Sequence, residues 1–345
     1  MELTRLSSVV RVLLFYFTAL LLLIFVGGLL QLQFGLPGVI YMQLLIFFTL
    51  PFVFTKTVEG KPFKSFLRLR MLSFKGFAKA VFLGGLSWIT AQTMGAALVL
   101  ILRELGGEMF QPYEILLNAP AWLALLAGAL VPALAEELSF RGYVLGALRP
   151  LGPTAAVALT GILFGALHLS LIRLLPLALL GVVWSMVAQR SGSILPAMIA
   201  HLMNNGIALG LTFFFQGQMN PAADLEALDQ FPAVARWIAV FVIGAMSTGF
   251  GIAGFFLAAS FNKSDLSRPD EAQAEEEALA AKPPEAFAYA DPHDVSPEVQ
   301  AMESELAKLQ QRRRGMLQAM GGIAGIVIFA IFVYAAWREL DMVFK

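Results

Sequence analysis

The stretch VLLFYFTALLLLIFVGGLL, from Val12 to Leu30, contains no charged side chain and is apolar almost throughout. A helix rises about 1.5 Å per residue, so this length is close to what a hydrocarbon layer of about 30 Å requires. Arg5 and Arg11 precede the run. A signal peptide has a shorter apolar core and ends in a small-residue cleavage site. We therefore predict an uncleaved membrane-spanning helix.

The composition of the whole chain points the same way. Of its 345 residues, 58% are hydrophobic and only 14% are charged, whereas soluble domains are about half apolar and about a quarter charged. The formal net charge is zero, so no overall basic field predicts a nucleic-acid partner. The absence of cysteine excludes disulfides, cysteine nucleophiles and thiolate metal sites.

Apolar segments of comparable length recur along the chain and predict an all-α, polytopic transmembrane helical bundle. We expect about eight core spans plus a C-terminal span. Their approximate residue ranges are 12–30, 36–55, 77–102, 122–148, 154–171, 173–189, 193–215, 236–259 and 319–337.

Loop charges predict the orientation of this multi-pass protein. Segment 56–79 carries seven Lys or Arg residues against Glu59 alone, which places it and the N-terminus in the cytoplasm. Segments 103–118 and 216–235 are acidic on balance and fall outside, and Arg173 is the one exception. The short loops and the lack of a retention signal favour a bacterial cytoplasmic membrane.

Segment 262–300 differs from the rest, since it has ten Asp or Glu residues, three Lys or Arg and five prolines. Such a composition cannot bury a core, so we predict a disordered cytoplasmic linker that could recruit a partner. Ser296 and Pro297 then have the residue types of an N-cap and a first helical position. A short solvated helix leading into the last span is the favoured interpretation, and a helical pairing surface is the alternative.

Ionisable residues inside spans are costly, so each is a functional candidate. Glu136, Glu137 and Arg141 lie in one predicted span, His168 in the next, and His201 with Asn204 and Asn205 in a third. Glu137 and Arg141 have the favourable i,i+4 spacing, which predicts an ion pair and leaves Glu136 free for chemistry. Alternatively, both carboxylates pair with Arg141.

Helix rise places the candidate residues at overlapping depths. Measured from the predicted cytoplasmic ends, Glu136 lies about 20 Å deep, His168 about 22 Å and His201 about 14 Å. Polar groups from three spans at one level form a plausible site. The alternative is that the histidines are satisfied core residues whose depths coincide.

These side chains suit the hydrolysis of a peptide bond without a covalent intermediate. A partly buried carboxylate is a general base toward water, a histidine relays the proton, and a second histidine with an asparagine stabilises an oxyanion. Glu136, His168 and His201 are also a possible zinc ligand set, although the His-Glu-x-x-His signature is absent. Ser139, Ser170 and Thr160 are candidate nucleophiles by residue type only.

Three motifs in order resemble one known family. They are Glu136-Glu137-Leu138-Ser139-Phe140-Arg141 (Glu-Glu-x-x-x-Arg), Phe164-Gly165-Ala166-Leu167-His168 (Phe-x-x-x-His) and His201-Leu202-Met203-Asn204-Asn205 (His-x-x-x-Asn). The chain resembles the CPBP intramembrane proteases, which include type II CAAX prenyl endopeptidases and bacteriocin-processing and immunity proteins. The resemblance covers roughly residues 120–210.

The resemblance implies catalytic roles for Glu136, His168, His201 and Asn205. Glu136 would activate water with help from His168, while His201 and Asn205 would stabilise the oxyanion. Glu137, Arg141 and Phe164 would support the site. We expect no cofactor, with zinc as the alternative, and expect membrane lipid and a membrane-bound or lipidated protein or peptide as partners.

The resemblance at residues 120–210, together with the apolar segments and the acidic composition, divides the chain into five parts. They are N-terminal helices (1–119), a protease-like catalytic core (120–210), a closing helix (211–260), the acidic linker with its short helix (261–318) and the C-terminal span (319–345). Two functions of other classes compete with proteolysis. One is a non-catalytic membrane scaffold or immunity protein, and the other is a transporter that uses the buried Glu and His residues as a proton relay.

Overall fold

The computed structural model describes residues 2–60, 66–107, 118–216, 227–268 and 297–344. Within these ranges the chain is helical apart from turns and one isolated bridge between Leu72 and Leu266. Eight described helices are long and apolar enough to cross a membrane. The predicted all-α polytopic bundle is therefore confirmed, and the chain is an integral multi-pass membrane protein.

The first two spans are composite helices, because α-helical and π-helical (η) turns alternate along them. In chain order their parts are α1 (Glu2–Leu21), η1 (Leu22–Gly27), α2 (Gly28–Phe34), α3 (Leu36–Gln43), η2 (Leu44–Thr49), α4 (Leu50–Phe54) and η3 (Thr55–Glu59). Gly35 joins the two spans with a φ of 62°, a left-handed value that glycine adopts without a steric penalty.

The next two spans are α5 (Phe74–Glu104) and a third composite helix. The parts of that composite helix are α7 (Ala121–Leu125), η5 (Leu126–Leu130), α8 (Val131–Glu137), η6 (Leu138–Val144), α9 (Leu145–Leu148) and the 3₁₀ turn η7 (Arg149–Leu151). In its most apolar window 67% of the residues are buried, more than in any other described span. This helix lies at the centre of the bundle.

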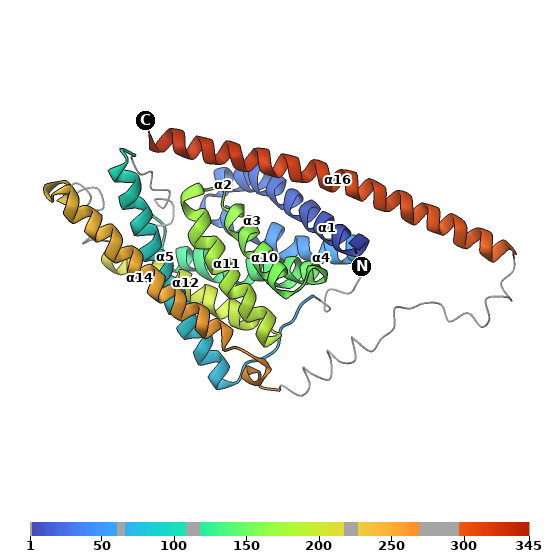
Figure 1. Cartoon of the computed structure of the whole chain (residues 1–345), viewed down its shortest axis with the longest axis horizontal. Coiled ribbons are helices and arrows are strands. Elements are labelled where there is room, and N and C mark those ends of the chain that lie inside the picture. The colour runs from blue at the N-terminus through green and yellow to red at the C-terminus, as the bar shows by residue number, and fades with distance from the viewer. Residues whose placement is uncertain (1, 61–65, 108–117, 217–226, 269–296, 345) are drawn as a thin grey trace.

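The remaining helices are α10 (Pro153–Leu167), α11 (Leu171–Ser191), α12 (Leu195–Phe215), α14 (Ala233–Ala259) and α16 (Pro297–Val343). Two short 3₁₀ turns, η8 (Leu228–Gln230) and η9 (Lys263–Asp265), flank α14. In Figure 1, α16 runs beside α1 along one side of the bundle, while α5 and α14 lie together at the opposite side.

The predicted span 154–171 is wrong in its length. Helix α10 ends at Leu167 after 15 residues, which is shorter than a spanning helix. Leu169 then takes a left-handed φ of 48°, and the Ser170 side chain caps α11 by accepting from the Arg173 amide. The apolar run continues through this turn, so hydrophobic periodicity could not mark where the helix ends.

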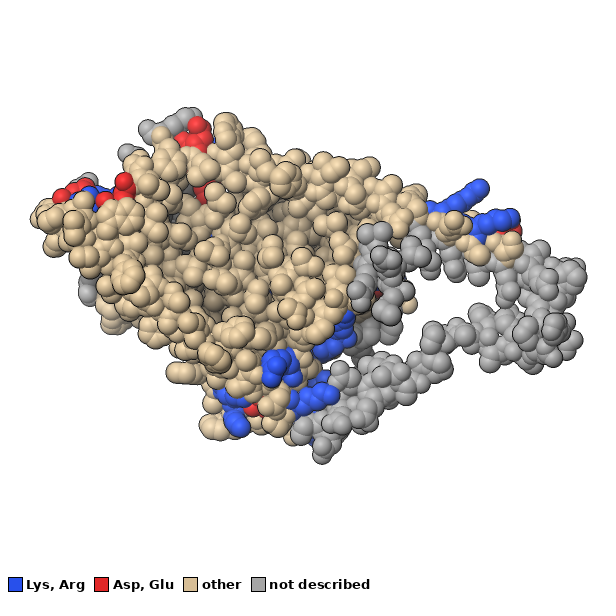
Figure 2. All heavy atoms as spheres, in the orientation of Figure 1, with Lys and Arg blue, Asp and Glu red and all other residues tan. Residues whose placement is uncertain are grey.

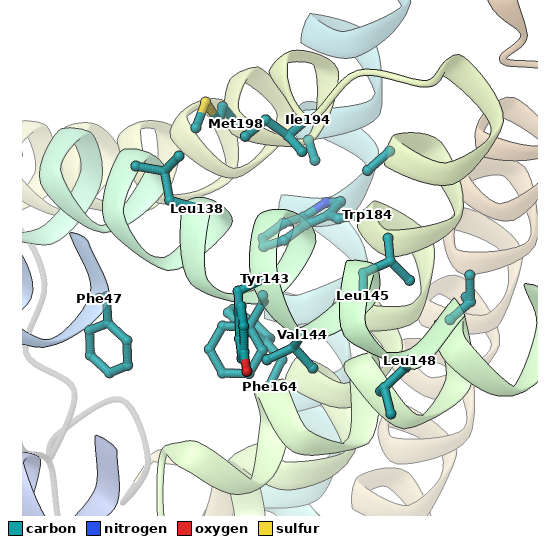
Figure 3. Close-up of a cluster of buried hydrophobic side chains, with 14 of the residues drawn as sticks. Phe47, Leu138, Tyr143, Val144, Leu145, Leu148, Phe164, Trp184, Ile194 and Met198 are labelled. Atoms are coloured by element: carbon teal, nitrogen blue, oxygen red, sulfur yellow. The ribbon is translucent and has the colours of Figure 1, made fainter. Parts of the chain in front are cut away.

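Helices α10 and α11 form a close hairpin because glycines face each other. A Cβ atom on Gly181 would lie 2.7 Å from the Cα of Gly161, and one on Gly165 would lie 2.7 Å from the Leu174 carbonyl oxygen. Backbones approach this closely only where no side chain intervenes. Large apolar side chains pack around the hairpin, including Phe164 of α10, Trp184 of α11 and Tyr143 of the central composite helix (Figure 3).

The chain after α14 is ordered further than predicted, because residues 261–268 pack against the start of α5. The fully buried Asp265 forms an ion pair with Lys79 at 2.8 Å, and its carbonyl oxygen accepts from the Ser73 amide. The linker therefore cannot begin at residue 261. The predicted disordered part at 269–296, and any partner it recruits, lies outside the described residues.

Helix α16 is a single helix of 47 residues, about 70 Å long. The predicted short helix and final span are thus continuous.

On the face drawn in Figure 2, Lys and Arg gather at the lower end of the bundle, and Asp and Glu gather mainly at the upper left end. The surface between them is almost free of charge, as a lipid-facing belt requires.

Candidate active site

The two adjacent glutamates of the central helix have different partners. Arg141 lies 2.7 Å from the Oε1 atom of Glu137, and both side chains are fully buried. The predicted i,i+4 ion pair is therefore present. Glu136 instead accepts a hydrogen bond of 2.8 Å from the amide nitrogen of Gln43, which ends α3. The alternative in which both carboxylates pair with Arg141 does not match this geometry.

Arg141 is held by several groups besides Glu137. Its guanidinium donates to the Gly181 carbonyl oxygen at 3.0 Å and to the Ser185 hydroxyl at 3.3 Å, both on α11. The Cζ atom of the Arg141 guanidinium also lies 4.6 Å from the centre of the Phe164 ring, a favourable cation–π distance. Arg141 thus joins the central helix to the α10–α11 hairpin.

His201 on α12 continues this network from the other side. Its Nδ1 atom lies 2.9 Å from the Oε1 atom of Glu137, and its Nε2 atom lies 3.1 Å from the Asn205 amide nitrogen. The Glu137 carboxylate accepts only, so in the neutral ring Nδ1 donates and Nε2 accepts. Glu137 therefore fixes the ring and would stabilise its protonated form, as the carboxylate of a catalytic triad does.

Trp184 on α11 stacks on the His201 ring with centres 4.6 Å apart and an angle of 24° between the planes. The indole N–H of Trp184 donates to the Ser87 hydroxyl on α5 at 3.1 Å. A stacked and hydrogen-bonded indole leaves the imidazole little freedom to tilt. Glu137 of α8 and Trp184 of α11 thus set the orientation of His201, and Ser87 of α5 holds Trp184 in place.

The side chain of Asn205 is fully engaged as a donor. Its amide nitrogen donates to the Gly128 carbonyl oxygen at 2.9 Å and to His201 at 3.1 Å. Its amide oxygen accepts from Asn204 at 2.8 Å. An amide nitrogen carries two hydrogens, so both are in use. Stabilising an oxyanion through Asn205 would require one of these bonds to open.

His168 directly follows α10. Its ring faces Phe164, as the ring of His201 also does. Its Nδ1 atom is 3.0 Å from the Phe164 carbonyl oxygen, and the two rings are 5.4 Å apart. With the proton on Nδ1, the lone pair of Nε2 is available to accept from water. His168 is half-buried.

The Phe164 ring lies 5.2 to 5.9 Å from each of the rings of Phe140, His168, Trp184 and His201. It therefore holds together the motifs that the sequence placed on separate helices. His168 and His201, predicted on separate spans, thus lie around the same Phe164 ring, and His201 also contacts Glu137.

The comparison with protein families matches this region of the chain. Residues 118–207 fit the model of the family described as type II CAAX prenyl endopeptidase Rce1-like. These residues form an Rce1-like domain. No curated protein and no solved structure matches the chain.

The Rce1-like domain contains every residue of the three motifs, but the match covers only about a quarter of the chain. It supports a CAAX-type intramembrane endopeptidase in general terms. Helices α1 to α5, α14 and α16 lie outside it.

Three side chains around the Rce1-like motifs were not predicted. Gln43 is a polar residue inside an apolar span, so the rule that selected the histidines could have selected it. Trp184 and Ser87 carry no such signal, because an aromatic residue and a serine are ordinary in membrane helices. Only their packing against His201 reveals their role.

The proposed zinc ligands of the Rce1-like domain do not form a metal site as arranged. Across the described ranges, no group of three or more His, Asp or Glu residues is placed to hold a metal ion. Both ring nitrogens of His201 already have hydrogen-bond partners, so neither is available as a ligand. The donor set as arranged therefore does not fit zinc.

The hydroxyls that were candidate nucleophiles bond to other groups. Ser139 donates to the Phe47 carbonyl oxygen at 2.7 Å, and Thr160 donates to the Ala156 carbonyl oxygen at 2.7 Å. Ser170 caps α11. Each of the three donates to a carbonyl or carboxylate oxygen and not to a histidine, the arrangement that would activate it.

A cavity of about 670 Å³ lies beside the Rce1-like domain, between α5, α11 and α14. Its walls are mostly apolar and include Ser87, which also bonds Trp184. None of the candidate catalytic residues lines it. The cavity therefore lies outside the candidate active site.

Proposed function

We propose that the protein is an intramembrane endopeptidase that hydrolyses a peptide bond of a membrane-associated or lipidated protein or peptide, using water activated by Glu136. The observation that carries this proposal is the division of roles between adjacent carboxylates. Glu137 is neutralised by Arg141, whereas the partner of Glu136 is the neutral amide of Gln43. A carboxylate without a cationic partner is the better base.

The reaction begins with a water molecule between Glu136 and His168. Glu136 accepts one proton of this water, and the Nε2 lone pair of His168 orients it. The water oxygen then bonds to the carbonyl carbon of the substrate, and the carbonyl oxygen becomes an oxyanion. No covalent bond to the enzyme forms.

The oxyanion is stabilised by Asn205 and His201. Asn205 exchanges its bond to the His201 Nε2 atom for one to the oxyanion. The freed Nε2 atom then takes up a proton from the solvent and donates a hydrogen bond to the oxyanion. Glu137 supports the resulting imidazolium through Nδ1. The C–N bond then breaks as the proton held by Glu136 passes to the leaving amine. His201 returns its proton to the solvent as the products leave, which restores the starting charges of the enzyme.

The charge distribution supports a cytoplasmic N-terminus and linker. The basic loop 56–79 and Arg190 would then lie on the cytoplasmic side, and the acidic loops on the other. The site would process substrates that reach it from the cytoplasmic side of the bilayer, in what we expect to be a bacterial membrane.

The decisive experiment is cleavage of membrane-anchored peptides, prenylated and unprenylated, by the purified protein, with metal content measured in parallel. Glu136→Gln, His168→Ala and His201→Ala should each abolish cleavage while the protein stays folded. Ser139→Ala is the control from the same helix, and it should retain cleavage. Full activity of Glu136→Gln would contradict the proposal.

The metal measurement separates two mechanisms. Cleavage by metal-free wild type supports water activated by the glutamate alone. Stoichiometric zinc, with activity that is lost on chelation and restored by metal, would instead make Glu136, His168 and His201 ligands in a rearranged site.

A further inference from the structure

Helix α16 brings a carboxylate to the turn that follows His168. The Ser170 hydroxyl donates to the Oε1 atom of Glu339 at 2.6 Å. The amide of Leu171 donates to the Oε2 atom, and the amide of Ile172 lies 3.4 Å from that atom. Glu339 is thus bonded to the first turn of α11 by three donors.

This arrangement is favourable for both partners. The first amides of a helix have no acceptor within the helix and form its positive end. Glu339 lies in an apolar segment that is long enough to cross a membrane, where an unpaired carboxylate would be costly. Binding the amides of α11 satisfies the carboxylate and the helix end together.

The position of α16 is set independently of this contact. Gly321 packs directly on Val10 of α1, since a Cβ atom there would lie 2.5 Å from the valine side chain. Near its other end, Val343 packs on Gly107, just beyond α5. Contacts on both sides of Glu339 therefore hold its carboxylate in place against α11.

The turn bound by Glu339 is the one that carries His168. Leu169 separates His168 from Ser170 and has a φ of 48°, a conformation that is strained for leucine and persists only when its surroundings impose it. One side of the turn is held through the bond between His168 and the Phe164 carbonyl oxygen. Glu339 holds the other side.

We propose that Glu339 is a positioning residue for His168, which it acts on by fixing the 168–172 turn. The inference rests on the proposed function, because His168 is taken to orient the water. Glu339 lies far outside the segment that matches the Rce1-like family. The chain would thus complete its active site with a helix from its own C-terminal part.

The test compares Glu339→Ala and Glu339→Gln with Glu305→Ala in the full-length protein. Glu305 is an exposed carboxylate on the same helix, where it pairs with Lys308. Two quantities are measured: hydrogen exchange of the Leu171 and Ile172 amides, and kcat and KM for the cleaved peptide. Wild-type cleavage is measured beforehand and tests the proposed function alone.

For Glu339→Ala we expect amide exchange to accelerate about tenfold, since one hydrogen bond per amide is lost. We expect kcat to fall about 10- to 100-fold, as small displacements of catalytic groups do, with KM unchanged. Glu339→Gln retains an acceptor but not the charge, so it should be intermediate. Glu305→Ala should match wild type.

Two results would overturn the proposal. Faster exchange at Leu171 and Ile172 with an unchanged kcat would show that the turn is bound by Glu339 without positioning His168. Unchanged exchange in Glu339→Ala would show that the carboxylate does not hold the turn. Because exchange is read without substrate, it distinguishes these failures from failure of the proposed activity.

Discussion

Replacing Arg141 with methionine should destabilise the protein strongly while preserving much of the apolar volume. The substitution removes the Arg141 guanidinium from the buried Glu137 carboxylate, which keeps its hydrogen bond from the His201 N–H. Removing one partner of a buried ion pair costs about 3–5 kcal/mol. The Gly181 carbonyl oxygen also loses its bond to Arg141, which adds about 1–3 kcal/mol.

The adjacent glutamates provide a matched pair of second substitutions. In the Arg141→Met background, Glu137→Gln removes the unpaired charge but keeps an acceptor for His201. It should therefore restore the stability lost in Arg141→Met, except for the roughly 1–3 kcal/mol that comes from the unpaired Gly181 carbonyl oxygen. Glu136→Gln in the same background should restore nothing, because Glu136 does not bond Arg141 and is paired with Gln43.

Thermal unfolding in detergent measures these differences. At about 2–4 °C per kcal/mol, Arg141→Met should lower Tm by about 10 °C or more, and Glu137→Gln should recover over half of the loss. Equal recovery by Glu136→Gln would show that both carboxylates share the arginine. A wild-type Tm for Arg141→Met would refute the buried pair and the separate roles of the two glutamates.

Two further substitutions test groups that hold the site. Gln43→Leu removes the amide that donates to Glu136. It should lower kcat about tenfold, which is the effect of one hydrogen bond to a charged group. An unchanged kcat in the peptide assay would show that the amide does not support the base. Gly321→Leu must push α16 away from Val10, whereas a Cβ atom on Gly322 meets nothing within 4 Å. Gly321→Leu should therefore reduce kcat and speed amide exchange at Leu171, Gly322→Leu should do neither, and identical behaviour of the two variants would argue against the role given to α16.

Sequence spacing worked well where an interaction lies within one helix. The Glu137–Arg141 pair follows from helix geometry, because residues four apart lie on the same face. The apolar runs likewise gave the membrane location and the helical class, since a lipid environment requires the backbone to satisfy its own hydrogen bonds. The length of α10 was not predictable in this way, because its end is set by the left-handed Leu169 and not by a change in polarity.

The amino-acid sequence by itself therefore determined that this protein is a membrane helical bundle and which ionisable residues are candidates for its chemistry. Tertiary structure decided how those residues are deployed: Gln43 meets Glu136 across 93 positions of the chain, and Glu339 meets Ser170 across 169. The reason is physical. A charged residue in an apolar segment is visible as an energetic cost wherever it stands, but its partner is selected by helix packing, which local periodicity does not encode.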